Sequence, residues 1–138
     1  MDAAMPHPNS YEAEHYAVDA FATEDERTYS LLTHLAGLLS FLDMGIFLSP
    51  VAVLIMWQVK KGQSHWQDDH LKEAMNFQIS MLIWALIGLV FSIVTLGIGA
   101  VIVVPGLLAL RIVGTVRAAI FANKGRYYRY PMCFRLIS

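Results

Sequence analysis

The sequence AMNFQISMLIWALIGLVFSIVTLGIGAVIVVPGLLAL, residues 74–110, holds no Asp, Glu, Lys or Arg in 37 consecutive positions. An uncharged apolar run of about 18 residues or more is typical of a membrane span. As one helix the run would be roughly 55 Å long, whereas the hydrocarbon layer of a bilayer is about 30 Å thick. We therefore predict a membrane hairpin that turns at residues 95–99, where helix-weakening Gly and Thr residues are clustered.

The composition supports a single membrane domain. Of the 138 residues, 57% are hydrophobic and 15% are charged, compared with about 45–50% and 25% in soluble domains. Residues 1–29 hold seven acidic residues and one basic residue, a net charge of −6, and the remainder holds four acidic and nine basic residues, a net charge of +5. The single cysteine, Cys133, excludes a disulfide within the chain. An acidic tail therefore precedes a basic membrane body.

The sequence before the hairpin predicts a tail and two short helices. Residues 1–28 are acidic, contain prolines and lack the apolar stretch of a secretory signal, so we expect a disordered N-terminal tail. Residues 29–59 are apolar but contain Asp43 and Pro50. One helix across them would place the aspartate in mid-membrane, at a cost of about 2.5–3.5 kcal/mol, and the proline would remove a backbone hydrogen bond. We favour a turn at residues 43–45 over one kinked helix.

The predicted fold is therefore all-α: a polytopic membrane helical bundle of about four transmembrane helices, two short and two long. The expected helices are residues 29–42, 46–59, 69–94 and 99–122, within one membrane domain at residues 29–138. A charged loop, residues 60–73, precedes the third helix. We expect Asp68 or Asp69 to be the N-cap of that helix.

Positive charge predicts the orientation in the membrane. Three lysines precede the hairpin and four basic residues follow it, whereas the turn at residues 95–99 carries no charge. The positive-inside rule therefore places the charged loop and the C-terminus in the cytoplasm. Aromatic and basic residues on this side are expected to lie at the lipid headgroups. They are Trp66, His70, Tyr127, Tyr128, Arg129 and Tyr130.

Polar residues within the apolar helices form the candidate interaction site, because intramembrane polar groups are costly unless they have partners. They are His34, Glu73, Asn76, Gln78, Ser80, Arg111 and Arg117. Glu73, Asn76 and Ser80 share one stripe of the third helix, whereas Gln78 points elsewhere. Such a stripe either hydrogen-bonds a neighbouring helix or lines a pore or substrate groove, and the sequence leaves both open. His34 is expected first to hydrogen-bond between helices and second to handle a proton or ligand.

The two arginines of the fourth helix lie at different depths of the predicted hairpin. A turn near residue 97 places Arg117 level with Phe77, where it pairs with Glu73 or reaches the headgroups. Arg111 is deeper, roughly level with Trp84, and is expected to face the bundle interior, a water-filled cavity or the Trp84 ring. The alternative is a shifted fourth helix that brings Arg111 nearer the interface.

No motif indicates an enzyme. The chain lacks a phosphate-binding glycine loop, GxSxG, HExxH and cysteine-based metal motifs, and its basic residues follow membrane topology rather than one nucleic-acid-binding face. His70 and Glu73 have a spacing that can hold a metal, but polar groups at a helix start usually cap the helix or face solvent. We therefore expect no catalytic residue, no cofactor, no metal and no nucleic-acid partner.

Three blocks of the sequence carry a family resemblance. They are residues 26–28 and 33–39 followed by Ile55-Met56-Trp57 and Lys60-Lys61, residues 69–80 (DHLKEAMNFQIS), and residues 122–131 (ANKGRYYRYP). These blocks resemble the Tic-twenty-like family, bacterial domains of unknown function related to a subunit of the chloroplast inner-envelope protein import complex. The resemblance implies about four spans and a place in a bacterial inner membrane, but little defined activity.

Two functions follow as hypotheses. The first is a non-enzymatic integral membrane protein that acts through helix–helix contacts, as a subunit or as an assembly or translocation factor. The alternative is a small oligomeric channel or permease-like protein, with a polar path lined by His34, Asn76, Gln78 and Arg111. The expected partners are the lipid bilayer and either other proteins or further copies of this chain. A membrane enzyme ranks third.

Overall fold

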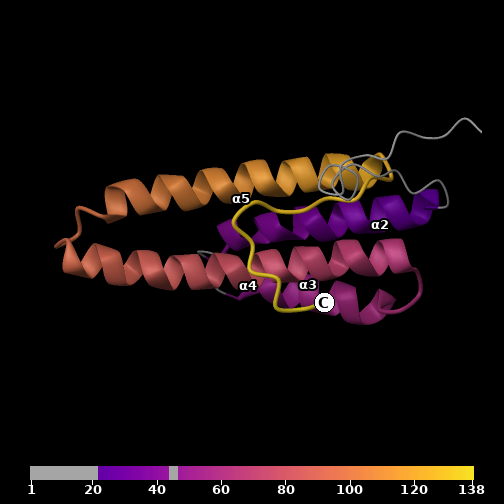
Figure 1. Cartoon of the computed structure of the whole chain (residues 1–138), viewed down its shortest axis with the longest axis horizontal. Coiled ribbons are helices and arrows are strands. Elements are labelled where there is room, and N and C mark those ends of the chain that lie inside the picture. The colour runs from indigo at the N-terminus through magenta and orange to yellow at the C-terminus, as the bar shows by residue number, and fades with distance from the viewer. Residues whose placement is uncertain (1–21, 44–46) are drawn as a thin grey trace, which may run out of the picture.

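The computed structural model describes residues 22–43 and 47–138, and this part of the chain folds into helices followed by an extended C-terminal segment. The elements are α2 (Glu24–Leu35), the 3-10 helix η1 (Ala36–Phe41), α3 (Leu48–Lys60), α4 (His65–Val94) and α5 (Ala100–Asn123). Figure 1 shows their arrangement. The described residues therefore agree with the all-α class predicted from the sequence.

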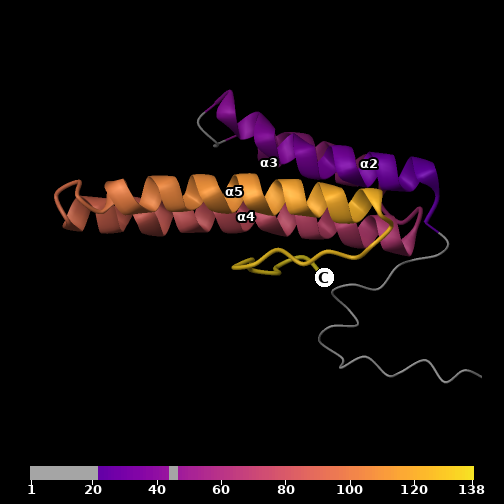
Figure 2. The ribbon, with the colours of Figure 1, turned by 90° about the horizontal axis from the view of Figure 1, so that it is seen from above.

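The long helices α4 and α5 form an antiparallel hairpin, and shorter elements cover only part of its length (Figure 1). α2 and α3 lie on one face of the hairpin, and residues 126–138, here called the strap, run along the opposite face (Figure 2). The strap begins at the end where α4 starts and α5 finishes, here called the charged end. The other end, at residues 95–99, is here called the turn end.

The hairpin has the length that its uncharged sequence predicts. α4 has 30 residues and α5 has 24, so they are roughly 45 Å and 36 Å long at 1.5 Å per residue. Both are long and apolar enough to cross a membrane, and they are the two such helices in the described residues. The turn lies between Val94 and Ala100, as predicted, with Leu96 and Gly97 at positive φ angles of 54° and 93°.

The two shorter elements differ from the predicted short spans. α3 has 13 residues, roughly 20 Å, and α2 with η1 reaches only partway along the hairpin (Figure 1). The predicted turn at residues 43–45 lies largely outside the described residues. The Asp43 carboxylate accepts hydrogen bonds from the backbone N–H of Phe47 and Leu48 at 2.8 and 2.6 Å, so it caps the start of α3.

Two helices begin earlier than predicted, because residues before them act as N-caps. Thr23 and Glu26 form a capping box: the Thr23 hydroxyl accepts from the Glu26 N–H at 3.2 Å, and the Glu26 carboxylate accepts from the Thr23 N–H at 2.7 Å. The disorder predicted through residue 28 is therefore wrong from Glu24 onward, and residues 1–21 lie outside the described part. α4 is capped by Ser64, which replaces the predicted caps at residues 68 and 69.

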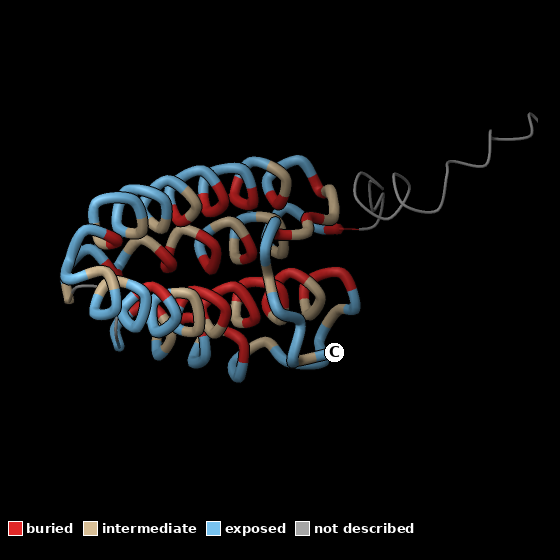
Figure 3. The backbone as a smooth tube through the Cα atoms, turned by 60° about the vertical axis from the view of Figure 1, so that its left-hand side comes forward, coloured by how far each residue is buried: buried red, intermediate tan, exposed pale blue. Residues whose placement is uncertain are grey.

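Burial is unequal along the hairpin (Figure 3). Buried residues gather at the charged end, where α2, α3 and the strap surround α4 and α5. Beyond them, the large apolar side chains of the hairpin are exposed, including Leu86, Leu89, Val94, Val101 and Ile102. An exposed apolar surface of this extent is typical of a membrane or protein interaction surface.

α4 approaches α5 closely at Gly88. A Cβ atom placed there would lie 2.3 Å from the Val103 Cγ1 atom, and Val103 cannot move aside easily because its χ1 is restricted. Small residues of this kind let membrane helices pack closely.

Replacing this glycine tests the packing of the hairpin. We expect Gly88→Ala to lower the free energy of unfolding by about 1–3 kcal/mol, the usual cost of overpacking. Gly106→Ala is the matched control, since a Cβ atom there meets nothing within 4 Å. Thermal unfolding of both variants in the same detergent measures the difference, and equal melting temperatures would contradict the close contact between Gly88 and Val103.

Candidate functional site

One face of α4 supplies hydrogen-bond partners to the backbone of the strap. Asn76 makes three of these bonds: its Oδ1 accepts from the N–H of Leu136 at 3.0 Å and of Ile137 at 2.8 Å, and its Nδ2 donates to the Ile137 carbonyl at 2.8 Å. The amide of Asn76 thus replaces the neighbouring strand that an extended backbone ordinarily needs. Asn76 is itself buried.

The same face continues toward the turn end. The Ser80 hydroxyl accepts from the Phe134 N–H at 2.7 Å and donates to the Asn76 carbonyl at 2.7 Å. One turn further, the Trp84 indole N–H donates to the Met132 carbonyl at 2.9 Å. Trp84 extends the predicted polar stripe by four residues, a spacing that keeps it on the same helix face. From the sequence, Trp84 was considered only as an aromatic ring that Arg111 could face, although its spacing from Ser80 could have placed it in the stripe.

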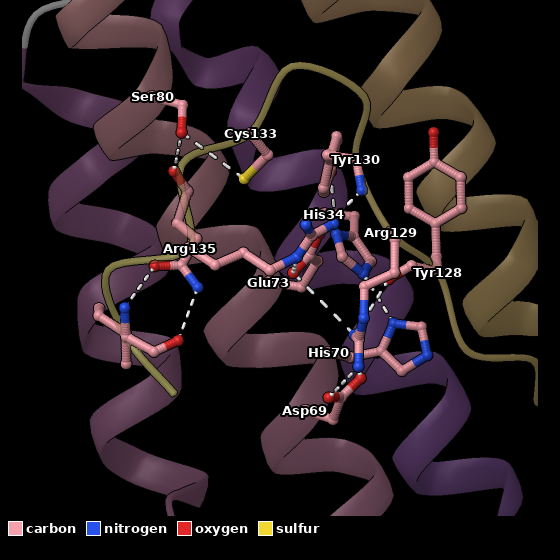
Figure 4. A network of polar contacts seen from close by, with 12 residues as sticks. His34, Asp69, His70, Glu73, Ser80, Tyr128, Arg129, Tyr130, Cys133 and Arg135 are labelled. Carbon is pink, nitrogen blue, oxygen red and sulfur yellow. Dashed lines mark hydrogen bonds and ion pairs between the residues drawn. The ribbon is translucent and has the colours of Figure 1, made fainter. Parts of the chain in front are cut away.

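Glu73 joins the strap to α4 at the charged end (Figure 4). Its carboxylate is buried, accepts from the Tyr130 N–H at 2.8 Å and pairs with Arg135 at 3.2 Å. Beside it, Asp69 accepts two hydrogen bonds from Arg129, at 2.6 and 2.7 Å. Such a two-pronged pair fixes orientation as well as attraction. Arg129, which the sequence assigned to the headgroups, therefore holds the strap in place together with Arg135.

A chain of hydrogen bonds through two buried histidines joins α2, α4 and the strap (Figure 4). The His34 Nδ1 atom lies 3.0 Å from the Tyr130 hydroxyl, and its Nε2 atom lies 2.9 Å from the His70 Nδ1 atom. The His70 Nε2 atom lies 3.0 Å from the Arg126 carbonyl. Each histidine is 1% exposed.

When both imidazole rings are neutral, the Arg126 carbonyl fixes the direction of every hydrogen bond in this series. A carbonyl oxygen only accepts, so the His70 Nε2 atom carries hydrogen and its Nδ1 atom accepts. His34 therefore donates from Nε2, and its Nδ1 atom accepts from the Tyr130 hydroxyl. All four groups are satisfied, and loss of one leaves a buried neighbour unpaired, at about 1–3 kcal/mol.

The Tyr130 ring is also tightly packed. Its ring stacks on Phe77 with centroids 3.9 Å apart, and Gly114 provides room for it, since a Cβ atom there would lie 3.1 Å from the ring. Burial raises the pKa of the Tyr130 phenol well above its ordinary value of 10.0. The phenol therefore stays protonated at neutral pH and donates to His34.

Arg111 of α5 lies in the interior and contacts a face of α4 that the strap does not cover. It is 7% exposed and donates to the Gly37 carbonyl at 2.9 Å and to the Gln78 Oε1 atom at 3.1 Å. Gly37 permits this approach, because a Cβ atom there would lie 2.8 Å from the Gln78 amide nitrogen. Arg111 is therefore bonded to Gln78 rather than to the Trp84 ring.

The predicted site residues thus separate into three groups. Asn76, Ser80 and Glu73 bond the strap, His34 bonds His70 and Tyr130, and Gln78 bonds Arg111. Arg117 is exposed on α5, and Glu73 pairs with strap arginines in its place.

Four of the residues that the sequence assigned to the headgroup region are buried inside the protein. They are Trp66, His70, Tyr128 and Tyr130. The difference arises because the strap folds back along the hairpin, so Tyr128 and Tyr130 are buried against it, and Tyr127 of the strap contacts Trp66 and His70 of α4. Tyr127 and Arg129, from the same assignment, are partly buried.

The side chains of Asp68, Asp69 and His70 near the start of α4 are held by protein partners. Asp68 pairs with Lys72 at 3.0 Å and accepts from the Trp57 indole at 3.0 Å. Within residues 22–43 and 47–138, no group of three or more His, Cys, Asp or Glu side chains is arranged to hold a metal ion.

The fold and this site define a small helical membrane protein, in which a hairpin of two long apolar helices holds an extended C-terminal strap. Residues 25–137 match the MamF/MmsF family, described as the magnetosome magnetite crystal formation protein family. Because the match covers most of the chain, the chain belongs to this family. No curated protein and no solved structure matches it.

The family match corrects the resemblance inferred from the sequence. The three blocks that resemble the Tic-twenty-like family lie wholly within the matched residues 25–137, which belong to the magnetosome family. The Tic-twenty-like assignment is therefore wrong. The shared features, apolar spans with polar stripes and basic ends, follow from membrane topology and do not distinguish families.

Removing the Asn76 amide is expected to loosen the strap. Asn76→Leu removes the partner of three backbone groups, and because Leu136 is exposed and Ile137 is partly buried each loss costs about 0.5–1.5 kcal/mol, the ordinary net value of a hydrogen bond. Cys133, the single cysteine, lies half-buried in the strap, and burial raises the pKa of its thiol. We therefore expect maleimide to label Cys133 at neutral pH roughly tenfold faster or more in this variant, since 1.4 kcal/mol is a factor of ten.

The control for this experiment is Asn123→Leu, the same change at an exposed position on α5. It should leave the labelling rate at the wild-type value. Equal rates in the wild type and in Asn76→Leu would contradict the role of Asn76.

The raised pKa of Tyr130 predicts a loss of stability in alkali. The folded chain holds the phenolic proton more tightly than the unfolded chain. The stabilisation that the protonated phenol contributes is therefore complete below about pH 10 and falls as the pH rises beyond it. Tyr130→Phe should lower the free energy of unfolding at pH 7 by about 1–3 kcal/mol and flatten its decline above pH 10. Denaturant unfolding across this range measures both effects, and parallel curves would contradict the buried phenol.

Proposed function

We propose that this chain is a non-enzymatic magnetosome membrane protein that takes part in magnetite crystal formation through contacts made by its helices and strap. The family match over residues 25–137 carries the proposal, because it spans the chain from α2 to the end of the strap. The match concerns the whole helical unit rather than one motif.

The site supports a role through contacts rather than through a reaction. The Glu73, Asn76 and Ser80 side chains are engaged with the strap backbone, and His34 is engaged with His70 and Tyr130. Ser80 and His34 are buried against other parts of the same chain, whereas Glu73 and Asn76 line an open cavity of about 330 Å³ but already bond the strap. Support for a polar path is weaker, since His34, Asn76 and Gln78 lie in separate sets of hydrogen bonds.

We further propose that the charged end faces the cytoplasm. Basic residues before and after the hairpin lie at this end, and the turn end carries none. Short loops rich in lysine and arginine favour the cytoplasmic side of a membrane. In a magnetosome membrane this orientation directs residues 95–99 away from the cytoplasm, toward the compartment in which a crystal forms.

Gene deletion in the magnetite-forming host tests the proposal. We expect smaller or fewer crystals in electron micrographs of whole cells, and a fluorescent fusion of the chain located at the magnetosomes. The wild type and Asn123→Leu should restore the crystals, whereas Asn76→Leu should restore them less well because its strap is loosened. Unchanged crystals after deletion, or a fusion spread evenly over the cell membrane, would contradict the proposal.

A further inference from the structure

The groove between α4 and α5 continues beyond the tip of the strap. The strap fills the groove from the charged end as far as Met132, where the chain turns back with a φ angle of 54°. Past this point lies an open cavity of about 360 Å³ between the two helices. Its lining includes Trp84, Phe91, Val103 and Leu107.

The shape of this cavity fits a single extended chain. The strap, which is one extended chain, occupies the adjoining part of the same groove and packs against Phe77 of α4 and Ala118 of α5. At Gly88, which lines the cavity, α4 is in close contact with Val103 of α5. A helix about 10–12 Å across can pack over touching helices, as α2 does on the opposite face, whereas a slimmer extended chain reaches the floor of the groove.

The chemistry of the cavity excludes a peptide and water. Along the strap, α4 offers a polar partner at each turn, and Trp84 is the last of them. Beyond Trp84 the cavity is lined almost wholly by apolar groups. A peptide backbone there would leave its N–H and C=O groups unpaired, and water needs several polar partners to be held.

The depth of the cavity exposes it to the hydrocarbon of a bilayer. Trp84 lies 11 residues from Glu73 and 11 residues from Thr95, which is roughly 16 Å from each at 1.5 Å per residue. The surrounding surface, including Ile87, Leu86 and Val104, is exposed and apolar. The extended chain available at this depth is hydrocarbon.

We propose that this cavity binds one acyl chain of a bilayer phospholipid, seated in line with the strap and against the Trp84 ring. The acyl chain buries apolar surface that neither the strap nor the shorter helices cover. This inference stands independently of the proposed role in crystal formation, because it rests on the hairpin and the strap alone.

The test uses Trp84 as a reporter in the full chain. Trp57→Phe and Trp66→Phe leave it as the one tryptophan of three; in the described residues the Trp66 indole N–H has no partner to lose. The protein is reconstituted in phosphatidylcholine vesicles that contain phosphatidylcholine brominated at mid-chain, a quencher of tryptophan fluorescence. We expect strong quenching of the Trp84 fluorescence in this parent protein, and much weaker quenching in the Gly106→Leu variant.

Gly106→Leu adds an apolar side chain at the cavity lining, where a Cβ atom meets nothing within 4 Å. The matched control is Val104→Leu, which adds bulk to α5 at an exposed residue outside the cavity lining. It should keep the quenching of the parent. Melting temperatures of both variants confirm that they fold alike, and native mass spectrometry should show one retained phospholipid in the parent and none in Gly106→Leu.

Three results would overturn the proposal. One is equal quenching in the parent and in Gly106→Leu, and another is an equal loss in Val104→Leu. The third is weak quenching that rises when the protein is diluted in lipid, which would show that a second copy fills the cavity.

Discussion

The strap depends on α4 for hydrogen bonds that an isolated extended chain cannot make for itself. Unpaired N–H and C=O groups are costly wherever water is excluded. A carboxylate, an amide, a hydroxyl and an indole, each about one turn apart on one helix face, supply the missing partners. The buried histidines then join this assembly to α2, so the order of the charged end rests on the side chains of α4.

The hairpin could be predicted from the sequence, whereas the partners of its polar residues could not. An uncharged apolar run of 37 residues is typical of a membrane segment, and it is too long for one span, so it requires a turn. The stripe of Glu73, Asn76 and Ser80 was visible, but its partner lies 54 to 61 residues later in an extended segment without periodicity. Arg111 likewise bonds a backbone carbonyl, at Gly37, that no side-chain pattern reveals.

Some of the missed boundaries did have a signal in the sequence. Thr23 and Glu26 have the spacing of a capping box, and Ser64 precedes α4 as a good N-cap. These signals were outweighed by the acidic composition of the tail and by the carboxylates at residues 68 and 69. The family assignment failed for a related reason, since sequence blocks shaped by membrane topology resemble one another across families.

Hydrogen–deuterium exchange of the strap amides tests whether α4 holds the strap. We expect slow exchange at the N–H groups of Tyr130, Phe134, Leu136 and Ile137, because α4 side chains accept from all four. The exposed loop at residues 61–63 provides the fast reference within the same chain. Exchange of the four strap amides at the rate of that loop would contradict the dependence of the strap on α4.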